Sequence, residues 1–298
     1  MNTELIIAVL AGCGGMIGWG FSEFAAKKAV DTIGTISSLV WAHVFGTLIL
    51  CALLLLRILT TNTFEGLFLS LADFSLLLLF GALQAIVYYF AYKGFEKGQV
   101  SILSPIFSSF AALVAICSIL FLGETIHGTS MFALPIIFVG VLLINIKLEG
   151  LRLGRIHFHA VPGLKEIVIA TILATIWTLG WNVFSDGKDW LVYTTLLFAG
   201  MTVSAFLIAK CASVNLNLVN RDAHKFLWWV ALGEVIGYLA ITVGYANTTH
   251  TSIVAILSGA SSVPTIFLAQ VFLSEKMTRI QAVSSLLIIA GIVLLSIS

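Results

Sequence analysis

The chain has 298 residues, of which 60% are hydrophobic and 10% are charged, and its formal net charge is +1. Soluble domains carry about 25% charged residues, so the composition excludes a soluble protein, and the small net charge gives no reason to expect nucleic-acid binding. The apolar runs are about 20 residues long, the length of a helix that crosses a bilayer. The alternating pattern of a membrane β-barrel is absent. The sequence therefore predicts an all-α membrane protein embedded in a lipid bilayer.

Ten apolar runs predict ten transmembrane helices, five in each half of the chain. The longest polar break lies between the halves. We therefore expect a first repeat at 1–147, a linker at 148–164 and a second repeat at 165–298. The predicted helices cover residues 5–25, 35–59, 73–92, 99–122, 128–147, 165–184, 192–211, 225–246, 250–273 and 278–297.

The stretch from Tyr88 to Ile144 returns in the second half without a gap when 151 is added to each residue number. Chance supplies single apolar matches in so hydrophobic a chain, but it is a poor explanation for polar and glycine matches in one register. A repeat of five helices crosses the bilayer an odd number of times, so the two copies have opposite orientations. We therefore predict two inverted five-helix repeats around a central cavity. The matched pairs include Ser101 and Ser252, Phe121 and Phe272, Glu124 and Glu275, and Gly140 and Gly291.

Basic residues are distributed unevenly between the loops. Two of the 15, Arg57 and Lys188, lie in even-numbered loops, and the other 13 lie in or beside odd-numbered loops. Because loops rich in Lys and Arg stay in the cytoplasm, we expect the odd loops inside and both termini outside. The 13 residues are Lys27, Lys28, Lys93, Lys97, Lys147, Arg152, Arg155, Lys165, Lys210, Arg221, Lys225, Lys276 and Arg279.

The first predicted helix combines small residues with a polar face. Gly14 and Gly18 have the small-xxx-small spacing that lets helices approach closely in lipid. Trp19 and Glu23 follow one turn apart on one face, which makes both of them candidates for a binding site. A surface ion pair between Glu23 and Lys27 is the alternative.

The second and third predicted helices carry polar groups at depth. An imidazole in hydrocarbon needs a polar partner, so His43 either faces a cavity or forms a structural hydrogen bond to a neighbouring helix. Gln84, Tyr88 and Tyr92 stand at i, i+4 and i+8 and form a polar stripe on one helix face. An interfacial aromatic belt explains Tyr92 well and Gln84 badly.

The fourth and ninth predicted helices share serines and a proline. Pro105 removes an amide donor and is expected to disturb the backbone near Ser101. Interrupted helices at matching places in inverted halves indicate the central site of a transporter, although serines also serve as small packing residues. The candidates are Ser104, Ser258 and Ser262 for binding, and Pro105 and Pro264 for helix breaks.

The sixth predicted helix contributes Trp181 and Asn182. If the first and sixth helices correspond at an offset near 162, Trp19 aligns with Trp181. Both halves would then present an indole at one symmetric level. An interfacial tryptophan anchor is the competing interpretation.

Glu234 stands near the middle of the apolar span 226–246 and is the only acid that the sequence places near a bilayer centre. An acid at that depth costs a few kcal/mol. It therefore persists either as a neutral, hydrogen-bonded group or because a cation or proton uses it. Tyr238 continues the same helix face. We interpret Glu234 as a substrate or proton site, with a structural role as the alternative.

Glu124 and Glu275 each follow Phe-Leu and begin a tight turn that leads into another helix. A carboxylate at such a position accepts hydrogen bonds from free helix amides, so we expect both to be structural caps. The four cysteines are scattered over different predicted helices without paired spacing. The sequence therefore predicts no disulfide, no metal site and no cofactor.

These motifs resemble the EamA domain of the drug/metabolite transporter superfamily. The resemblance departs at Ser274, where Gly is usual, and at Ile256, which lacks the proline found at Pro105. It implies a ten-helix inverted-repeat transporter of small metabolites, a group that includes amino-acid exporters, and it carries no family-wide catalytic motif. The motifs are Ser101 to Pro105, Phe121-Leu122-Gly123-Glu124, Gly140-Val141, Phe272-Leu273-Ser274-Glu275 and Gly291-Ile292.

The expected function is secondary transport by alternating access, with export of amino acids or amines across a bacterial or archaeal inner membrane and proton coupling as one option. All Lys and Arg fall at helix ends or in loops, which favours a cationic, zwitterionic or neutral solute over a phosphate anion. A uniporter or exchanger of another small solute is the alternative. An intramembrane enzyme is not expected, because only His43 and Glu234 form a deep titratable pair. The oligomeric state stays open, a monomer included.

Overall fold

The computed structural model describes residues 3–62, 69–121, 128, 130–143, 162–216, 221–273 and 279–296. All regular secondary structure within these ranges is helical, so the all-α prediction is confirmed. The helices are α1 (Thr3–Ile33), α2 (Thr35–Thr61), α3 (Leu71–Lys97), α4 (Val100–Ser108), α5 (Phe110–Phe121), α6 (Ser130–Leu143), α7 (Leu164–Ser185), α8 (Trp190–Cys211), α9 (Arg221–Asn247), α10 (Thr251–Gly259), α11 (Ser262–Leu273) and α12 (Arg279–Ser296).

Seven helical stretches of the described residues are long and apolar enough to cross a membrane. Large apolar side chains lie on their outer surface, as expected where lipid takes the place of water. Leu10, Leu59 and Leu79 are each more than 60% exposed, for example. The prediction of an integral membrane protein is confirmed, whereas the number of ten crossings stays a prediction. The seven are Thr3–Ile33, Thr35–Thr61, Leu71–Lys97, Leu164–Ser185, Trp190–Cys211, Ala223–Asn247 and Ile253–Leu273.

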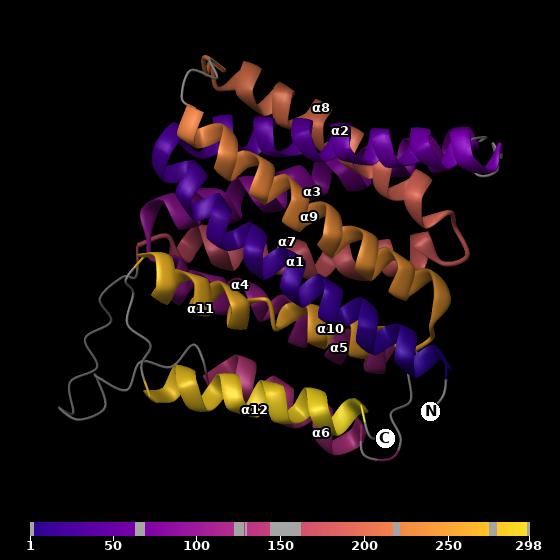
Figure 1. Cartoon of the computed structure of the whole chain (residues 1–298), viewed down its shortest axis with the longest axis vertical. Coiled ribbons are helices and arrows are strands. Elements are labelled where there is room, and N and C mark those ends of the chain that lie inside the picture. The colour runs from indigo at the N-terminus through magenta and orange to yellow at the C-terminus, as the bar shows by residue number, and fades with distance from the viewer. Residues whose placement is uncertain are drawn as a thin grey trace.

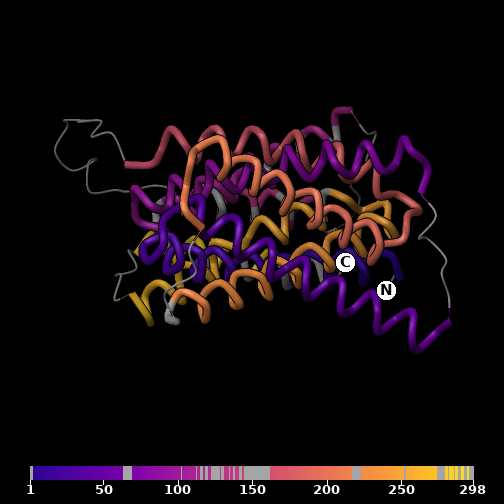
Figure 2. The backbone as a smooth tube through the Cα atoms, turned by 90° about the horizontal axis from the view of Figure 1, so that it is seen from above, coloured from indigo at the N-terminus to yellow at the C-terminus, as the bar shows by residue number. Residues whose placement is uncertain are grey.

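The helices lie side by side in a stack (Figure 1). Helices α2 and α8 pair at one edge and α6 and α12 at the other, with α1, α3, α7 and α9 near the middle. Helix α1 packs along α9, and α3 packs along α7 and α8. The chain starts and finishes at the same end of the stack, as Figures 1 and 2 show.

Close packing of α1 against α9 depends on glycine. A Cβ atom at Gly18 would lie 2.6 Å from the carbonyl oxygen of Gly233 and 2.6 Å from the amide nitrogen of Gly237. A Cβ atom at Gly14 would lie 2.7 Å from the Cβ of Ala240. Backbone atoms cannot move aside as side chains can, so any larger residue at Gly18 separates the helices. The predicted role of the Gly14 and Gly18 spacing in close packing is confirmed.

Two helix interruptions occur at positions that match in the two halves. The first, between α4 and α5, falls at Ser109, and the second, between α10 and α11, begins at Ala260. Their separation, 260 − 109 = 151, is the offset of the sequence repeat. The two interruptions also meet in space, since the Ser108 and Ser261 hydroxyls are 3.2 Å apart.

The predicted helix breaks at the prolines are wrong in position. Pro105 lies inside α4, and the interruption follows four residues later at Ser109 rather than near Ser101. There the Ser109 amide and hydroxyl both turn back to the carbonyl of Ile106, which closes a tight turn and ends the helix. Pro264 lies in the first turn of α11, where a missing amide costs nothing.

Some sequence predictions fall outside the described residues. Both predicted caps, Glu124 and Glu275, and residues 148–161 of the predicted linker are among them. The cap assignments and the division into two repeats therefore stay predictions.

Candidate functional site

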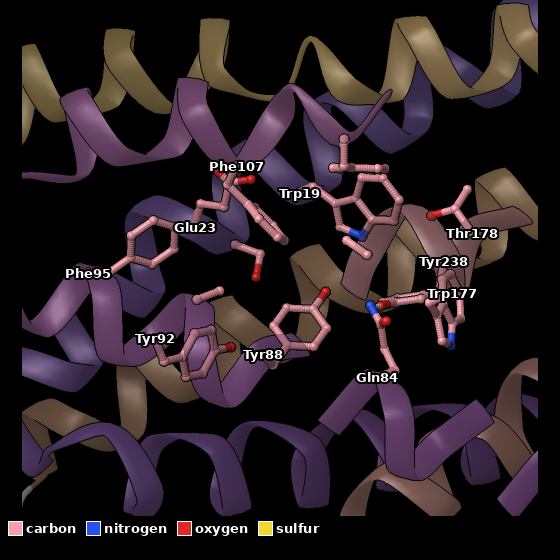
Figure 3. A pocket seen from close by; sticks show the side chains of 14 residues that line it. Trp19, Glu23, Gln84, Tyr88, Tyr92, Phe95, Phe107, Trp177, Thr178 and Tyr238 are labelled. Carbon is pink, nitrogen blue, oxygen red and sulfur yellow. Dashed lines mark hydrogen bonds between the residues drawn. The ribbon is translucent and has the colours of Figure 1, made fainter. Parts of the chain in front are cut away.

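A cavity lies in the middle of the helix stack, between α1, α3, α4, α5, α7 and α9. Figure 3 shows side chains that converge on it from opposite walls. Six of the residues singled out in the sequence line it, on three different helices. These are Trp19 and Glu23 on α1, Gln84, Tyr88 and Tyr92 on α3, and Tyr238 on α9.

The cavity has a free volume of about 30 Å³. A water molecule needs about 10–15 Å³ measured in this way, so there is room for a water or two. Binding sites for small organic ligands measure about 300–1,000 Å³. In this conformation aromatic rings fill the space that a solute would need, and the Trp19 and Tyr238 rings contact each other at a centroid distance of 5.6 Å.

Glu23 is the acidic group of the cavity wall. Its carboxylate accepts hydrogen bonds from the hydroxyls of Ser104 on α4, Ser261 at 3.1 Å and Thr265 at 3.2 Å. Ser261 lies in the second interruption and Thr265 in α11, so the acid is held where the two interrupted helices meet. Hydroxyls can donate or accept, which lets them adjust to a change of partner at the carboxylate.

The surface ion pair considered for Glu23 is wrong. Glu23 is 8% exposed, and Lys27 instead pairs with Asp31 at 2.8 Å and donates to the carbonyl of Phe95. Glu234 is therefore not the only deep acid. The sequence places Glu23 near a charged helix end, but α1 continues to Ile33 and carries the acid inside the bundle.

Two further polar atoms of the cavity wall have no hydrogen-bond partner among the described residues. They are the indole Nε1 of Trp19, a donor, and the side-chain oxygen Oε1 of Gln84, an acceptor. The amide nitrogen of Gln84 donates to the Tyr238 hydroxyl. Buried polar groups usually have partners, so an open donor, an open acceptor and a carboxylate together indicate a place for a polar ligand.

Glu234 lies behind the cavity wall and is fully buried. Tyr92, whose side chain lines the cavity, donates its hydroxyl to Glu234 Oε1 at 2.7 Å. The other carboxylate oxygen, Oε2, lies 3.5 Å from Nε2 of His43, which is also fully buried. The structure thus brings together two residues that the sequence singled out on separate grounds.

Seven predicted site residues do not line the cavity. They are Ser104, which donates to Glu23, the pair His43 and Glu234, and the four residues that follow. Trp181 stacks on Trp177 at 5.4 Å and donates to Thr242 on α9. Asn182 is buried beside it. The Ser258 hydroxyl donates to the carbonyl of Ala255 within its own helix. Ser262 is fully buried at the start of α11. Trp19 and Trp181 therefore do not play equivalent roles at the cavity.

Sequence reasoning missed several residues of the wall. Ser261 and Thr265, the partners of Glu23, stand at i and i+4 on one helix face. Ser258 and Ser262 have the same spacing, so the spacing alone could not separate the two pairs. Apolar wall residues give no such signal, because any buried helix face is rich in them. These are Phe95, Phe107, Phe110, Ala91, Ala174 and Trp177, together with the small polar residues Ser22 and Thr178.

A second cavity, of about 280 Å³, lies at the turn between α1 and α2. Four of its polar side chains already have partners, since Lys93 donates to Tyr89 and Glu96 accepts from Thr35. It is larger than the central cavity but holds no predicted site residue, and we favour the central one. Within the described ranges, no group of three or more His, Cys, Asp or Glu side chains is placed to hold a metal ion.

Comparisons with known proteins agree with this fold. One solved crystal structure superimposes with a TM-score of 0.72 over 97% of this chain and 98% of its own, at 14% sequence identity, which shows a shared fold. A search of curated proteins gave no match. Residues 6–146 match the EamA-like transporter family. The family resemblance predicted from the motifs is thereby confirmed over these residues, and the match supports a membrane transporter of small solutes.

Proposed function

We propose that the protein is a secondary transporter that exports small cationic or zwitterionic metabolites, amines or amino acids, by alternating access. The observation that carries this proposal is the central cavity, where a buried carboxylate, an open donor and an open acceptor are surrounded by aromatic rings. The family match supports transport of small solutes in general. The direction of export rests on the family resemblance.

The chemistry of the wall suits an ammonium group. A cation is attracted both by the carboxylate of Glu23 and by the faces of aromatic rings, and aromatic side chains, Trp19 and Tyr88 among them, line the cavity (Figure 3). The Gln84 Oε1 atom would accept a hydrogen bond from the same ammonium. The Trp19 Nε1–H group would donate to a carboxylate, so the wall can serve both ends of an amino acid.

A phosphate or sugar-nucleotide anion fits this wall poorly. Proteins that bind such anions meet them with Arg or Lys inside the pocket. The buried polar and charged residues of the described chain include no Lys and no Arg, but they include both Glu23 and Glu234. An anion in this cavity would face the carboxylate of Glu23 with no buried Lys or Arg of the described residues to compensate.

The inverted-repeat architecture is supported by the way the helices pair. Each helix of α1–α6 has a counterpart six places later in α7–α12. Replacing every helix by its counterpart converts the contact of α1 with α9 into that of α7 with α3, and the contact of α2 with α9 into that of α8 with α3. The same replacement converts the contact of α10 with α5 into that of α4 with α11, and all of these helix pairs are in contact. The matched interruptions at Ser109 and Ala260 follow the same relation. We propose ten crossings in two inverted repeats, 1–147 and 165–298, around the central cavity.

Membrane orientation follows from the charge distribution. Thirteen of 15 basic residues lie at one side of the predicted bilayer, which supports cytoplasmic odd loops and external termini in an inner membrane. In agreement, the two chain ends lie at the same end of the helices (Figure 1). A monomer suffices for this mechanism, because one chain builds the whole cavity.

The test is counterflow in proteoliposomes that are loaded with a panel of unlabelled amines, amino acids, sugars and phosphates. Labelled solute should enter by exchange only for amines or amino acids. The E23Q variant should lose this exchange, and E166Q, which alters a carboxylate paired with Lys97 outside the cavity, should keep it. Exchange of a sugar or phosphate, or exchange that E23Q leaves unchanged, would contradict the proposed solute class and site.

A further inference from the structure

His43 is held in a fixed tautomer by its own helix. Its Nδ1 atom lies 2.7 Å from the carbonyl oxygen of Leu39. A carbonyl oxygen only accepts, so Nδ1 must carry the hydrogen atom. In a neutral His43 the opposite nitrogen, Nε2, therefore presents a lone pair.

That lone pair faces another acceptor. Nε2 lies 3.5 Å from Glu234 Oε2, and neither atom has a hydrogen-bond partner among the described residues. Oε1 of the same carboxylate already accepts from the Tyr92 hydroxyl. With His43 neutral and Glu234 ionised, two lone pairs would face each other in a buried site. One additional proton removes this conflict, whether it resides on Oε2 or on Nε2.

The surroundings of the pair supply no other positive charge. Tyr88 and Tyr92 on α3 and Tyr238 on α9 are the titratable groups nearest to it, and Phe198 on α8 packs on the imidazole at 6.0 Å. From α1, the Ser22 hydroxyl contacts Glu234, and Glu23 lies beyond Tyr92. No Lys or Arg is buried in the described part of the chain. A pair that has lost its proton would leave an uncompensated buried negative charge, which is strongly disfavoured.

We propose that His43 and Glu234 form a one-proton site that loads and releases its proton in exchange for the positive charge of a solute in the central cavity. The proton-binding half of this proposal stands on the geometry of the pair, and the exchange half rests on the proposed transport function. In the exchange, the bond from the proton to Oε2 or Nε2 breaks, the proton passes to water, and the arriving ammonium supplies the lost charge.

Tyr92 connects the two sites. Its side chain lines the cavity, and its hydroxyl donates directly to Glu234. A cation that enters the cavity therefore lies one side chain away from the carboxylate that it would stabilise. Tyr92 acts as a positioning residue, because it orients the carboxylate towards His43.

The proton site is tested in the purified protein without solute. In ¹⁵N-histidine NMR spectra, the signal that H43N removes should show the neutral Nδ1–H form or the imidazolium. Infrared difference spectra should show a pH-dependent band, of a protonated carboxyl or of an imidazolium, that disappears in E234Q and persists in E23Q and E166Q. A neutral Nε2–H tautomer for His43, or spectra in which E234Q removes no pH-dependent band, would overturn the site. If H43N does not fold, the infrared comparison still decides.

The exchange is tested by adding an amine that counterflow has identified. Calorimetry in buffers of different ionisation enthalpy should show one proton released per solute bound, and this release should vanish in E234Q while binding persists. Equal release in E234Q and wild type would overturn the exchange. Failure of every amine and amino acid to bind would instead refute the proposed function, and the spectra would still decide the proton site.

Discussion

Glu23 and Glu234 are both buried in the same helix stack, but their surroundings differ in kind. Glu23 lies in the cavity wall among three hydroxyls, which can rotate and exchange partners. Glu234 lies behind the wall, between a phenol and an imidazole whose tautomer its own helix fixes. The comparison teaches that burial alone does not assign a role to an acid. Adaptable partners suit the binding of a solute, and fixed partners suit the binding of a proton.

The relative positions of Glu23 on α1 and Glu234 on α9 depend on the packing of these two helices. Disrupting this packing should have the largest effect on the protein. G18V places side-chain atoms where the α9 backbone lies, 2.6 Å from the position of its Cβ. Overpacking commonly costs about 1–3 kcal/mol when side chains can yield, and here the obstacle is backbone. We expect no folded G18V protein in size-exclusion chromatography. G180A, which meets only the Phe80 ring, should fold, and a stable G18V would contradict the packing.

Charge selectivity separates the two acids most clearly. Hydrogen bonds to charged groups contribute about 1.5–3 kcal/mol, so E23Q should weaken binding of an amine by about tenfold to a hundredfold. It should leave the binding of an uncharged analogue of the same shape nearly unchanged. E234Q should change the affinity for either solute much less than E23Q changes the affinity for the amine. Isothermal titration calorimetry of both solutes with both variants measures these affinities. Equal losses of amine affinity in E23Q and E234Q would contradict separate roles for the two acids.

Removing one hydroxyl tests the connection between the sites. Y92F keeps the ring in the cavity wall and deletes the donor to Glu234 Oε1. The loss of one hydrogen bond to a carboxyl, worth about 1–2 kcal/mol, should shift the pH midpoint of the infrared band by about one unit. Y89F is the matched control, because Tyr89 contacts Lys93 away from both acids. A midpoint that moves equally in both variants would exclude a specific role for Tyr92.

A third carboxylate, that of Asp189, shows how much a structural acid contributes to stability. Asp189 accepts both hydrogen bonds from Arg57 Nη1, at 3.0 and 2.7 Å, and caps α8 through the amides of Leu191 and Val192. D189A should lower stability by about 1 kcal/mol, the usual cost of losing a helix cap, without changing solute exchange. D189N should retain most of the cap. Thermal unfolding with counterflow in parallel measures both, and a loss of exchange in D189A would show that this end of α8 also controls transport.

Much of the fold could be predicted because it follows from strong, long-range patterns. Runs of apolar residues indicate buried or lipid-facing helices whatever their neighbours, and glycines at Gly14 and Gly18 indicate close packing. The positions of the helix interruptions could not be derived from proline. The interruptions occur in both halves, but only the first half has a proline within the preceding helix, Pro105. Tertiary contact at the Ser108–Ser261 crossing accompanies them, and no local sequence pattern encodes that contact.

The candidate site was predicted in part, for a similar reason. Polar side chains in apolar helices are conspicuous, so His43, Gln84 and Glu234 could be found by depth alone. Which of them share a cavity depends on how helices distant in sequence pack together. The sequence gives no measure of where α1 ends, so Glu23 looked like a surface residue beside Lys27. Serines occur too often as packing residues to tell Ser261 from Ser262 without the structure.

The difference between the two acids is tested most directly by solute accumulation in proteoliposomes with an imposed pH gradient. Wild-type protein should concentrate an amine above its equilibrium level when protons flow in the opposite direction. E23Q should transport no amine, whereas E234Q should equilibrate the amine by exchange but never concentrate it. If E234Q concentrates the amine as the wild type does, Glu234 is not the proton site and the division of roles between the two acids is wrong.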